Sequence, residues 1–263
     1  MTAVGPAPPS LRALISAIQF LTRLPVPVDP AADAETAAED LRAGLIYFPL
    51  VGAGIGAVTA LALFLLSWVL PFSVAVIAAL AVEARLTGAL HEDAVADACD
   101  ALGGGTTRDD VLRILKDSRI GSYGALGLGL AVAMRAAGLI ALGNPLAAGI
   151  VLIVAGAVGR LVILAVMVLV PPVDGRDSLS NALGNAAGWD GVVQGALLVS
   201  PVLALGLWFD VVAVAIAALG LSIFLVWYRA LLMRRLGGVT GDCLGFAAYA
   251  GIVIATLAFA RQV

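Results

Sequence analysis

Seven long apolar segments constrain this chain more than any other feature, because each is close to the roughly 20 residues that a helix needs to cross a bilayer core. They run near 43–68, 72–90, 122–142, 147–170, 191–209, 211–228 and 243–260. Only 13% of the residues are charged, whereas a soluble domain has about a quarter. The sequence therefore predicts an all-α fold, a polytopic membrane helix bundle of about seven transmembrane helices.

The segment before the first span is amphipathic rather than continuously apolar. Apolar side chains recur at helical spacing in it, at Leu11, Leu14, Ile15, Ile18 and Leu21. Such a pattern is typical of a helix that lies in the membrane interface. We expect one integral-membrane catalytic domain over 1–263, with an N-terminal cytoplasmic or interfacial part (1–42) and a transmembrane bundle (43–260). Pro49 predicts a kink or tilt in the first span.

The connections between the spans differ strongly in length and charge. Those near 69–71, 143–146 and 210 are tight, and those near 91–121, 171–190 and 229–242 are longer and polar. The longer connections and the N-terminal part hold eleven of the fifteen lysine and arginine residues. The positive-inside rule then places these loops, and any chemistry they carry, in the cytoplasm. No basic stripe with interleaved aromatic residues appears, so nucleic acid is not an expected partner.

The run from His91 to Asp100 places four carboxylates and the only histidine directly after an apolar segment. In a helix, Asp93, Asp97 and Asp100 stand at i, i+4 and i+7 and share one face, where like charges repel. A divalent cation resolves that conflict, and oxygen ligands favour Mg²⁺. The alternative is a solvated acidic helix end. His91 is a candidate general base, or a hydrogen-bonded histidine at a helix entry.

Two further features follow the acidic run. The glycines at 103–105 predict an end to the acidic helix, and Thr107 is placed to cap a short helix with Asp109 and Asp110 in its first turn. Next, Lys116 and Arg119 stand at i, i+3 and can point at one phosphate group. Their alternative role is anchoring at the membrane surface. Ser118 lies between them and adds nothing to anchoring, which favours substrate contact.

Two other positions are candidates for holding an anionic ligand. Arg160 lies inside an apolar span, where a charge normally faces a cavity or a partner, and Glu83 can neutralise one of the intramembrane arginines. Thr240 and Asp242 lie in a glycine-rich segment at the cytoplasmic mouth of the last span. If a helix begins there, Asp242 either caps it or supplies another metal ligand. A basic pocket that faces a carboxylate-bound cation is typical of enzymes that catalyse phosphoryl transfer.

Several segments resemble, in order along nearly the whole chain, the motifs of the cobalamin synthase family, the adenosylcobinamide-GDP ribazoletransferases. They are TGALHED at 87–93 with Asp97 and Asp100, KDSRIGSYG at 116–124, GGVTGD at 237–242, QFLTRLPVP at 19–27 and FPLVG at 48–52. The resemblance implies the last assembly step of the cobalamin nucleotide loop. In it, a ribose hydroxyl of α-ribazole (or its 5′-phosphate) attacks the cobinamide-linked phosphate, GMP leaves, and Mg²⁺ is required.

The resemblance also implies roles for individual residues. Asp93, Asp97 and Asp100 would be metal ligands, one of these acids would take the proton of the hydroxyl, and Lys116 and Arg119 would hold the diphosphate, with Asp242 supporting the site. Together with the residues singled out above, the predicted catalytic residues are Asp93, Asp97 and His91. The predicted substrate-binding set is Lys116, Ser118, Arg119, Arg160, Thr240 and Asp242. The expected setting is the bacterial cytoplasmic (inner) membrane, with membrane lipid as a partner and a homo-oligomer left open. This chain departs from the family at Ala94 and Ala101, where glycine is common, at Cys243, where threonine is common, and at Tyr249, where glutamate is typical.

Two other classes fit parts of the pattern. A CDP-alcohol phosphotransferase would use the same metal and diphosphate chemistry, but its further Gly-x3-Asp-x3-Asp run is absent here. An ion-coupled transporter would carry carboxylates near the middle of its spans, whereas most acids here cluster at one side. Release of CMP from a CDP-alcohol would favour the first, and vesicle flux that depends on Asp93 without turnover would favour the second.

Overall fold

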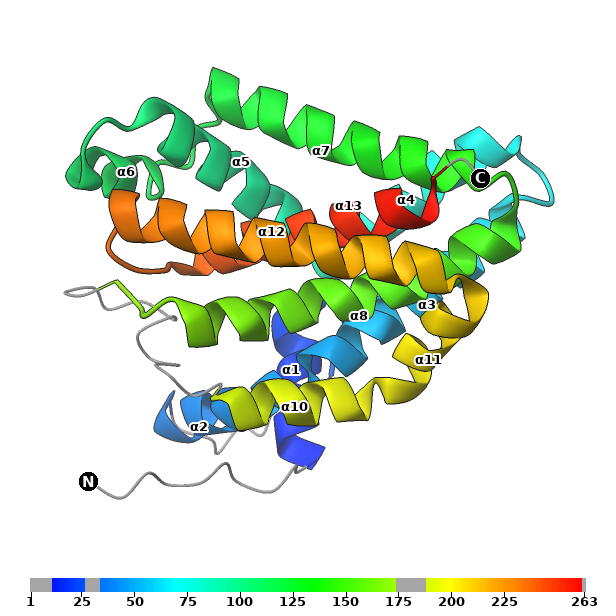
Figure 1. The fold of residues 1–263 in the computed structure, drawn as a ribbon, viewed down its shortest axis with the longest axis horizontal. Coiled ribbons are helices and arrows are strands. Elements are labelled where there is room, and N and C mark those ends of the chain that lie inside the picture. Colours follow the sequence, from blue (N-terminus) through cyan, green and yellow to red (C-terminus); the bar gives the residue numbers. More distant parts are fainter. Residues whose placement is uncertain (1–10, 27–33, 174–187, 262–263) are drawn as a thin grey trace.

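The computed structural model describes residues 11–26, 34–173 and 188–261, in which nearly all regular structure is helical (Figure 1). Most helices run roughly along one common axis, as expected for a transmembrane bundle. Part of the 19–27 motif and Arg176 lie outside the described residues. One isolated bridge pairs Pro172 with Val239.

Among the described residues, five helical segments are long and apolar enough to cross a membrane. They are Glu35–Leu66 (α2, Ala34–Gly44; η1, Leu45–Tyr47; α3, Phe48–Leu66), α7 (Ser122–Ala141), α8 (Pro145–Leu169), α12 (Val211–Arg235) and α13 (Gly241–Phe259). Two bent pairs raise the number to as many as seven if each pair is one span. They are α4 (Phe72–Thr87) with α5 (Leu90–Gly104), bent by 90°, and α10 (Trp189–Leu198) with α11 (Ser200–Phe209), bent by 64°. The all-α polytopic prediction is confirmed.

Helix α8 forms the centre of the bundle, because it packs along both α3 and α13. The approach of α3 to α8 is close enough to need glycine on both sides. A Cβ atom on Gly52 would lie 2.2 Å from the Gly156 carbonyl oxygen, and one on Gly56 would lie 2.3 Å from that of Leu152. Small residues at a helix interface let two membrane helices pack backbone against backbone. The α3–α8 pair is thus the most closely packed contact in the centre of the helix bundle.

Three boundaries differ from the sequence prediction. The span expected at 191–209 breaks at Val199, because Pro201 in the first turn of α11 has no amide hydrogen for the preceding turn. The span expected to end at 228 continues to Arg235, since arginine is a good helix former, and it ends where Gly237 takes a φ of 69°. The acidic helix continues through Gly103 and Gly104 and ends at Gly105.

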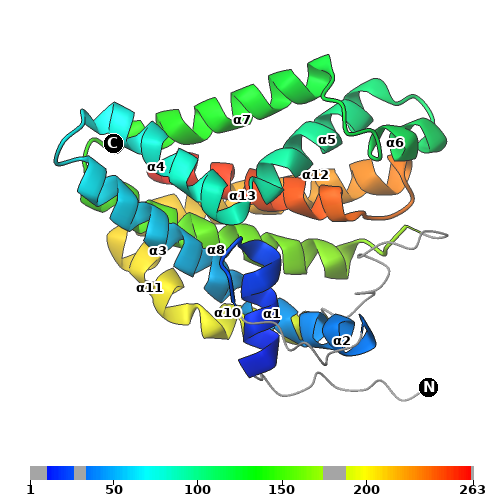
Figure 2. The same cartoon turned by 180° about the vertical axis from the view of Figure 1, so that it is seen from behind.

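The N-terminal helix α1 (Leu11–Leu21) crosses the bundle axis instead of following it (Figure 2). Its fully buried residues are Ala13, Ala17 and Leu21, which pack toward α2 and α3. Leu11 is 73% exposed, so the buried side is rotated from the apolar face that the sequence suggested. The irregularity expected at Pro49 appears as the 3₁₀ turn η1, directly before α3.

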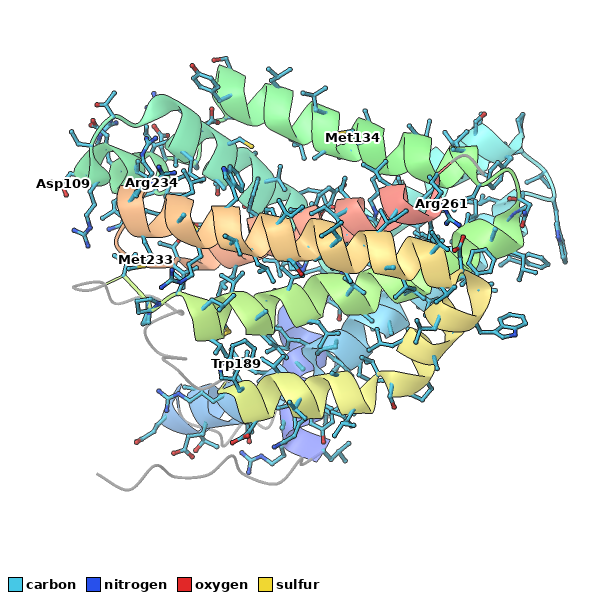
Figure 3. All side chains as sticks on the ribbon, in the orientation of Figure 1. Asp109, Met134, Trp189, Met233, Arg234 and Arg261 are labelled. Carbon is cyan, nitrogen blue, oxygen red and sulfur yellow. The ribbon has the colours of Figure 1, made fainter. Side chains whose placement is uncertain are left out.

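The two ends of the bundle differ in their charged residues. Figure 3 shows Asp109, Met233 and Arg234 near one end, the end at which α6 (Arg108–Ile114) and the last turn of α12 meet. Arg261 lies toward the other end, where it pairs with Asp210 at the α11–α12 junction. The arrangement matches the sequence division into a side with long polar connections and a side with tight ones.

Candidate functional site

A sharp break between α4 and α5 sets the direction of the acidic helix. Gly88 (φ 69°) and Ala89 (φ 56°) both adopt the left-handed conformation, which ends α4, and α5 starts again at Leu90 at 90° to it. The Asp93 amide then donates to the Ala89 carbonyl at 2.9 Å. The break turns the acidic helix so that it packs between α7 and α13.

The three aspartates of the acidic run gather on one side of α5, as the spacing predicts, whereas Glu92 lies near the buried Glu83 and Arg135. Asp93 is exposed, and Asp97 and Asp100 are partly exposed. The negative charges of Asp93, Asp242 and Asp100 all act on the Asp97 carboxylate. The fold therefore brings Asp242 of α13, which is far away in the sequence, to the acidic face of α5. Asp97 lies at the centre of this acidic face.

The donor chemistry of the acidic face suits Mg²⁺. No group of three or more histidine, cysteine or acidic side chains is arranged to hold a metal ion within the part of the chain that the structure describes. Mg²⁺ commonly needs only one or two carboxylates, because water and the phosphate oxygens of a substrate complete its shell. Asp93 and Asp97, with the charge of Asp242 beside them, offer that number of oxygen ligands. The Mg²⁺ prediction is not tested by the structure.

Asp100 has a second role that its position in the sequence does not reveal. Its carboxylate accepts backbone hydrogen bonds from Gly121 at 2.6 Å and from Gly124 at 2.8 Å. Gly121 is the N-cap of α7, so Asp100 supplies from another helix the negative group that a helix N-terminus favours. These bonds hold the 116–124 segment against the acidic helix.

The loop between α5 and α6 is tied to the end of α12. Thr107 caps α6, as the sequence predicted, and Asp110 returns a hydrogen bond to the Thr107 backbone, which makes a reciprocal capping box. The Arg108 Nε atom donates to the Leu236 carbonyl at 2.9 Å, and Arg235 donates to the carbonyl of Gly105. These two arginines therefore bind backbone at the rim of the site, a role more specific than anchoring at a membrane surface.

The basic segment after α6 is exposed beside the acidic face. Lys116, Ser118 and Arg119 are all exposed, and the Arg119 guanidinium makes two hydrogen bonds to Asp117, at 2.9 and 2.7 Å. These bonds hold the pKa of the Asp117 carboxyl at about 2, so this group is ionised at any physiological pH. Arg119 is thus oriented by Asp117, while Lys116 has no described ion-pair partner.

The third motif forms the start of α13. Thr240, only 3% exposed, is its N-cap, and the Thr240 hydroxyl accepts a hydrogen bond from the Cys243 amide at 3.4 Å. The Tyr228 hydroxyl donates to the Cys243 carbonyl at 2.9 Å. Thr240, and not Asp242, is therefore the cap, which leaves Asp242 in the first turn of α13 facing the acidic face. The predicted substrate contact of Thr240 stays a prediction.

A buried ionic cluster lies beneath the acidic helix. The Arg135 guanidinium of α7 donates a hydrogen bond to the Glu83 carboxylate of α4, with 2.8 Å between Nη2 and Oε2. Both side chains are 5% exposed or less. The Thr59 hydroxyl lies 3.0 Å from the same carboxylate oxygen, and the Tyr249 ring lies beneath the Arg135 guanidinium, 5.7 Å from its centre. The prediction that Glu83 neutralises an intramembrane arginine is confirmed, with Arg135 as the partner.

Arg160 and His91 complete this cluster from α8 and α5. Arg160 is 1% exposed, and its nearest acceptor is the Gly156 carbonyl at 3.4 Å. His91 is 5% exposed, and neither of its ring nitrogens has a hydrogen-bond partner among the described residues. Both side chains lie below the acidic face and not on it. Direct contact of Arg160 or His91 with a substrate stays a prediction.

The family departures fall in packing positions. Ala94 and Ala101 are 6% and 0% exposed. Helix α13 packs closely on Ala94, since a Cβ atom added to Gly245 would lie 2.5 Å from the Cβ atom of Ala94. Cys243 is fully buried, and Tyr249 is 2% exposed. The two substituted alanines thus lie on the buried side of α5, whereas Asp93 is exposed.

Comparison with known proteins gives a consistent result. Residues 13–260 match the family model described as cobalamin-5-phosphate synthase. The adenosylcobinamide-GDP ribazoletransferase of Leptothrix cholodnii is 41% identical over 252 residues, which cover 90% of each chain. Those of Shewanella baltica and Shewanella frigidimarina are 38% and 35% identical, and each match covers 88% of this chain and 87% of the relative. No solved structure matches the chain.

Proposed function

The chain belongs to the cobalamin-5-phosphate synthase family, and we propose that it joins adenosylcobinamide-GDP to α-ribazole or α-ribazole 5′-phosphate. The 3′-hydroxyl oxygen of the ribazole forms a bond to the phosphorus that carries the cobinamide. The bond from that phosphorus to the bridging oxygen breaks, and GMP leaves with this oxygen. The hydroxyl proton passes to a carboxylate of the acidic face. The products are adenosylcobalamin, or its 5′-phosphate, and GMP.

The observation that carries this proposal is the meeting of three separate motifs at one place. The acidic helix, the 116–124 segment and the start of α13 touch through Asp100 on the amides of Gly121 and Gly124 and through the charge of Asp242 on Asp97. The segment that carries Lys116 and Arg119 is thereby joined to the acidic helix, and phosphoryl transfer uses both a carboxylate-held metal ion and cationic side chains. The negative diphosphate of the substrate would bind both to Mg²⁺ held by the carboxylates and to the exposed cations.

We assign the roles by exposure and neighbours. Asp93 and Asp97 would hold Mg²⁺, which when bound offsets the negative charge of the phosphate oxygens and of the leaving group. Lys116 and Arg119 would bind the diphosphate, with Arg119 oriented by Asp117. Asp97 lies at the centre of the acidic face, beside Asp93, Asp100 and Asp242, so it is our candidate for the general base. The site would face the cytoplasm of a bacterial inner membrane, the side with most cations.

A direct assay tests the proposal. The purified protein in detergent is given adenosylcobinamide-GDP and α-ribazole, with and without Mg²⁺, and GMP release is measured. We expect release only when both substrates and Mg²⁺ are present, and Asp93→Asn is expected to remain folded and lose it. Release of CMP from a CDP-alcohol, with no GMP release, would contradict the proposal. Full turnover by Asp93→Asn would remove this residue from its assigned role.

A further inference from the structure

An apolar groove lies on the outside of the bundle, away from the acidic face. It has a volume of about 390 Å³ and runs between α1, α3 and the end of α4. Two residues of the apolar face of α1, Leu14 and Ile18, line this groove, while Leu21 of the same face is buried in the core. The main wall residues of the groove are Leu14, Ile18, Leu50, Gly54, Val58 and Leu86.

The groove has almost no polar group that could form a hydrogen bond with water. Thr22 is the one polar residue among those that line it, and the Thr22 hydroxyl already donates to the Ile18 carbonyl at 2.7 Å. Val58 is 46% exposed and Leu24 is 49% exposed, so the groove opens outward from a helix that crosses the membrane. Apolar cavities stay dry and accept apolar ligands. Because α3 belongs to a segment long and apolar enough to cross a membrane, we expect lipid as the surrounding solvent, and its chains match these walls.

A cation, Arg23, lies next to the groove without lining it. Arg23 follows Thr22 and precedes Leu24, both of which line the groove, and Arg23 is exposed. Its backbone amide donates to the Leu86 carbonyl at 2.7 Å, which fixes the residue at the end of α4. The guanidinium has no ion-pair partner among the residues that the structure describes. An arginine beside an acyl-chain groove complements the phosphate of a phospholipid.

From these observations we propose that the groove binds one acyl chain of a membrane phospholipid, whose phosphate pairs with Arg23. Gly54 gives the chain its room, because a Cβ atom there would meet nothing within 4 Å. The binding itself does not depend on the proposed transferase activity. The lipid class, a glycerophospholipid, follows from the two chemistries present together: an apolar channel for the chain and a guanidinium for the phosphate.

The same lipid acts on the break that directs the acidic helix. The Arg23 side chain lies against Gly88, where a Cβ atom would come within 2.3 Å of its Nε atom. Leu86, in the last turn of α4, forms part of the groove wall. Occupancy of the groove therefore supports the residues immediately before α5 begins.

The test measures lipid binding without substrate. The full-length protein is stripped of lipid in detergent, dioleoylphosphatidylglycerol is added back, and bound lipid is counted by native mass spectrometry. Wild type is expected to bind one tightly held lipid. Gly54→Leu fills the groove without a clash and is expected to weaken binding at least tenfold, and Val58→Phe is a second filling variant. The matched control is Gly129→Leu, since the space beside Gly129 is also open but lies on α7, and it should bind as wild type does.

A second comparison tests the phosphate. Arg23→Gln is expected to weaken phosphatidylglycerol binding and leave unchanged the weaker binding of dioleoylglycerol, which has the same chains without a phosphate. Arg234→Gln, at another exposed cation, is the control. Equal binding by the groove-filling variants and Gly129→Leu would overturn the proposal. So would equal affinity of wild type for the two lipids, or a change of oligomeric state in the filling variants, which would make a second copy the occupant.

Discussion

The Asp100 carboxylate of α5 accepts a hydrogen bond from the backbone amide of Gly124 in the first turn of α7, at 2.8 Å. A second bond, from Gly121 at 2.6 Å, reaches the other carboxylate oxygen. The two residues belong to different sequence motifs, so this contact joins the acidic helix to the segment that holds Lys116 and Arg119. The spacing of the acids and the cations across the site depends on it.

Replacement of Asp100 by asparagine is expected to lower stability as well as activity. The amide group of asparagine can accept only one of the two backbone hydrogen bonds, and loss of a hydrogen bond to a charged group costs about 1.5 to 3 kcal/mol. Reversible unfolding in mixed micelles measures the loss. Asp93→Asn, at an exposed carboxylate, is the comparison and should unfold as wild type does. Unchanged stability of Asp100→Asn would contradict the capping role.

Substitution of Gly124 by alanine is expected to displace the start of α7. The added Cβ atom would lie 2.2 Å from Asp100 Oδ2 and 2.8 Å from the Ala96 carbonyl oxygen. Gly129→Ala in the same helix meets open space, and there the change should stabilise the protein by about 0.5 to 1 kcal/mol. The rate of GMP release and the free energy of unfolding should both fall in Gly124→Ala and not in Gly129→Ala. Equal behaviour of the two variants would show that the contact is not needed.

Removal of the metal is expected to stop the reaction, and Asp97 should set the concentration at which Mg²⁺ restores it. With EDTA, GMP release should disappear and return on addition of excess Mg²⁺. Asp97→Asn removes one oxygen charge from the centre of the acidic face and should raise the half-saturating Mg²⁺ concentration about tenfold, equivalent to about 1.4 kcal/mol. A titration of rate against Mg²⁺ measures this. If the half-saturating Mg²⁺ concentration stayed unchanged and only the maximum rate fell, Asp97 would act as a base and not as a metal ligand.

Replacement of Lys116 by alanine is expected to raise the KM for adenosylcobinamide-GDP about tenfold, because the loss of one charge contact is worth about 1.4 kcal/mol. The KM for α-ribazole should not change, since that substrate brings no diphosphate. Arg234→Ala removes an exposed cation near the same end of the bundle (Figure 3) and serves as the control. Poor expression of Lys116→Ala with an unchanged KM would support a role in membrane anchoring instead.

The buried pair beneath the site makes a prediction about stability. Glu83→Gln removes the negative partner of Arg135 and leaves a buried guanidinium without a counter-charge, which costs about 3 to 5 kcal/mol. The double variant Glu83→Gln with Arg135→Met removes both charges and should recover most of that loss. A double-mutant cycle of unfolding free energies measures the coupling. Purely additive losses would show that the pair contributes nothing as a pair.

Several parts of the fold follow directly from the sequence. The spans, the Thr107 capping box and the helical acidic run rest on local patterns, and the structure has them at or near the expected places. The pairing of Glu83 with an arginine follows from the cost of a lone charge in lipid. The choice of Arg135 over Arg160 does not, because it depends on how α4, α7 and α8 pack.

Other parts depend on tertiary contacts that no local pattern contains. The sequence marks Asp100 by its spacing as one of three equivalent acids, but the structure sets it apart as the cap of α7. The 90° turn before α5 needs Ala89 in a left-handed conformation, which alanine rarely adopts. The glycines at 103 and 104 remain helical, although glycine is a poor helix former. In each case packing overrides the preference of the residue.

The left-handed conformation of Ala89 has one further consequence. An L-residue held there is strained by about 1 to 2 kcal/mol relative to its relaxed backbone, and this strain lies one residue before the acidic helix begins. Glycine at this position would relieve it at no steric cost. The chain thus keeps a strained turn where glycine would give a relaxed one, and a stiffer turn restricts the direction in which α5 and its carboxylates point.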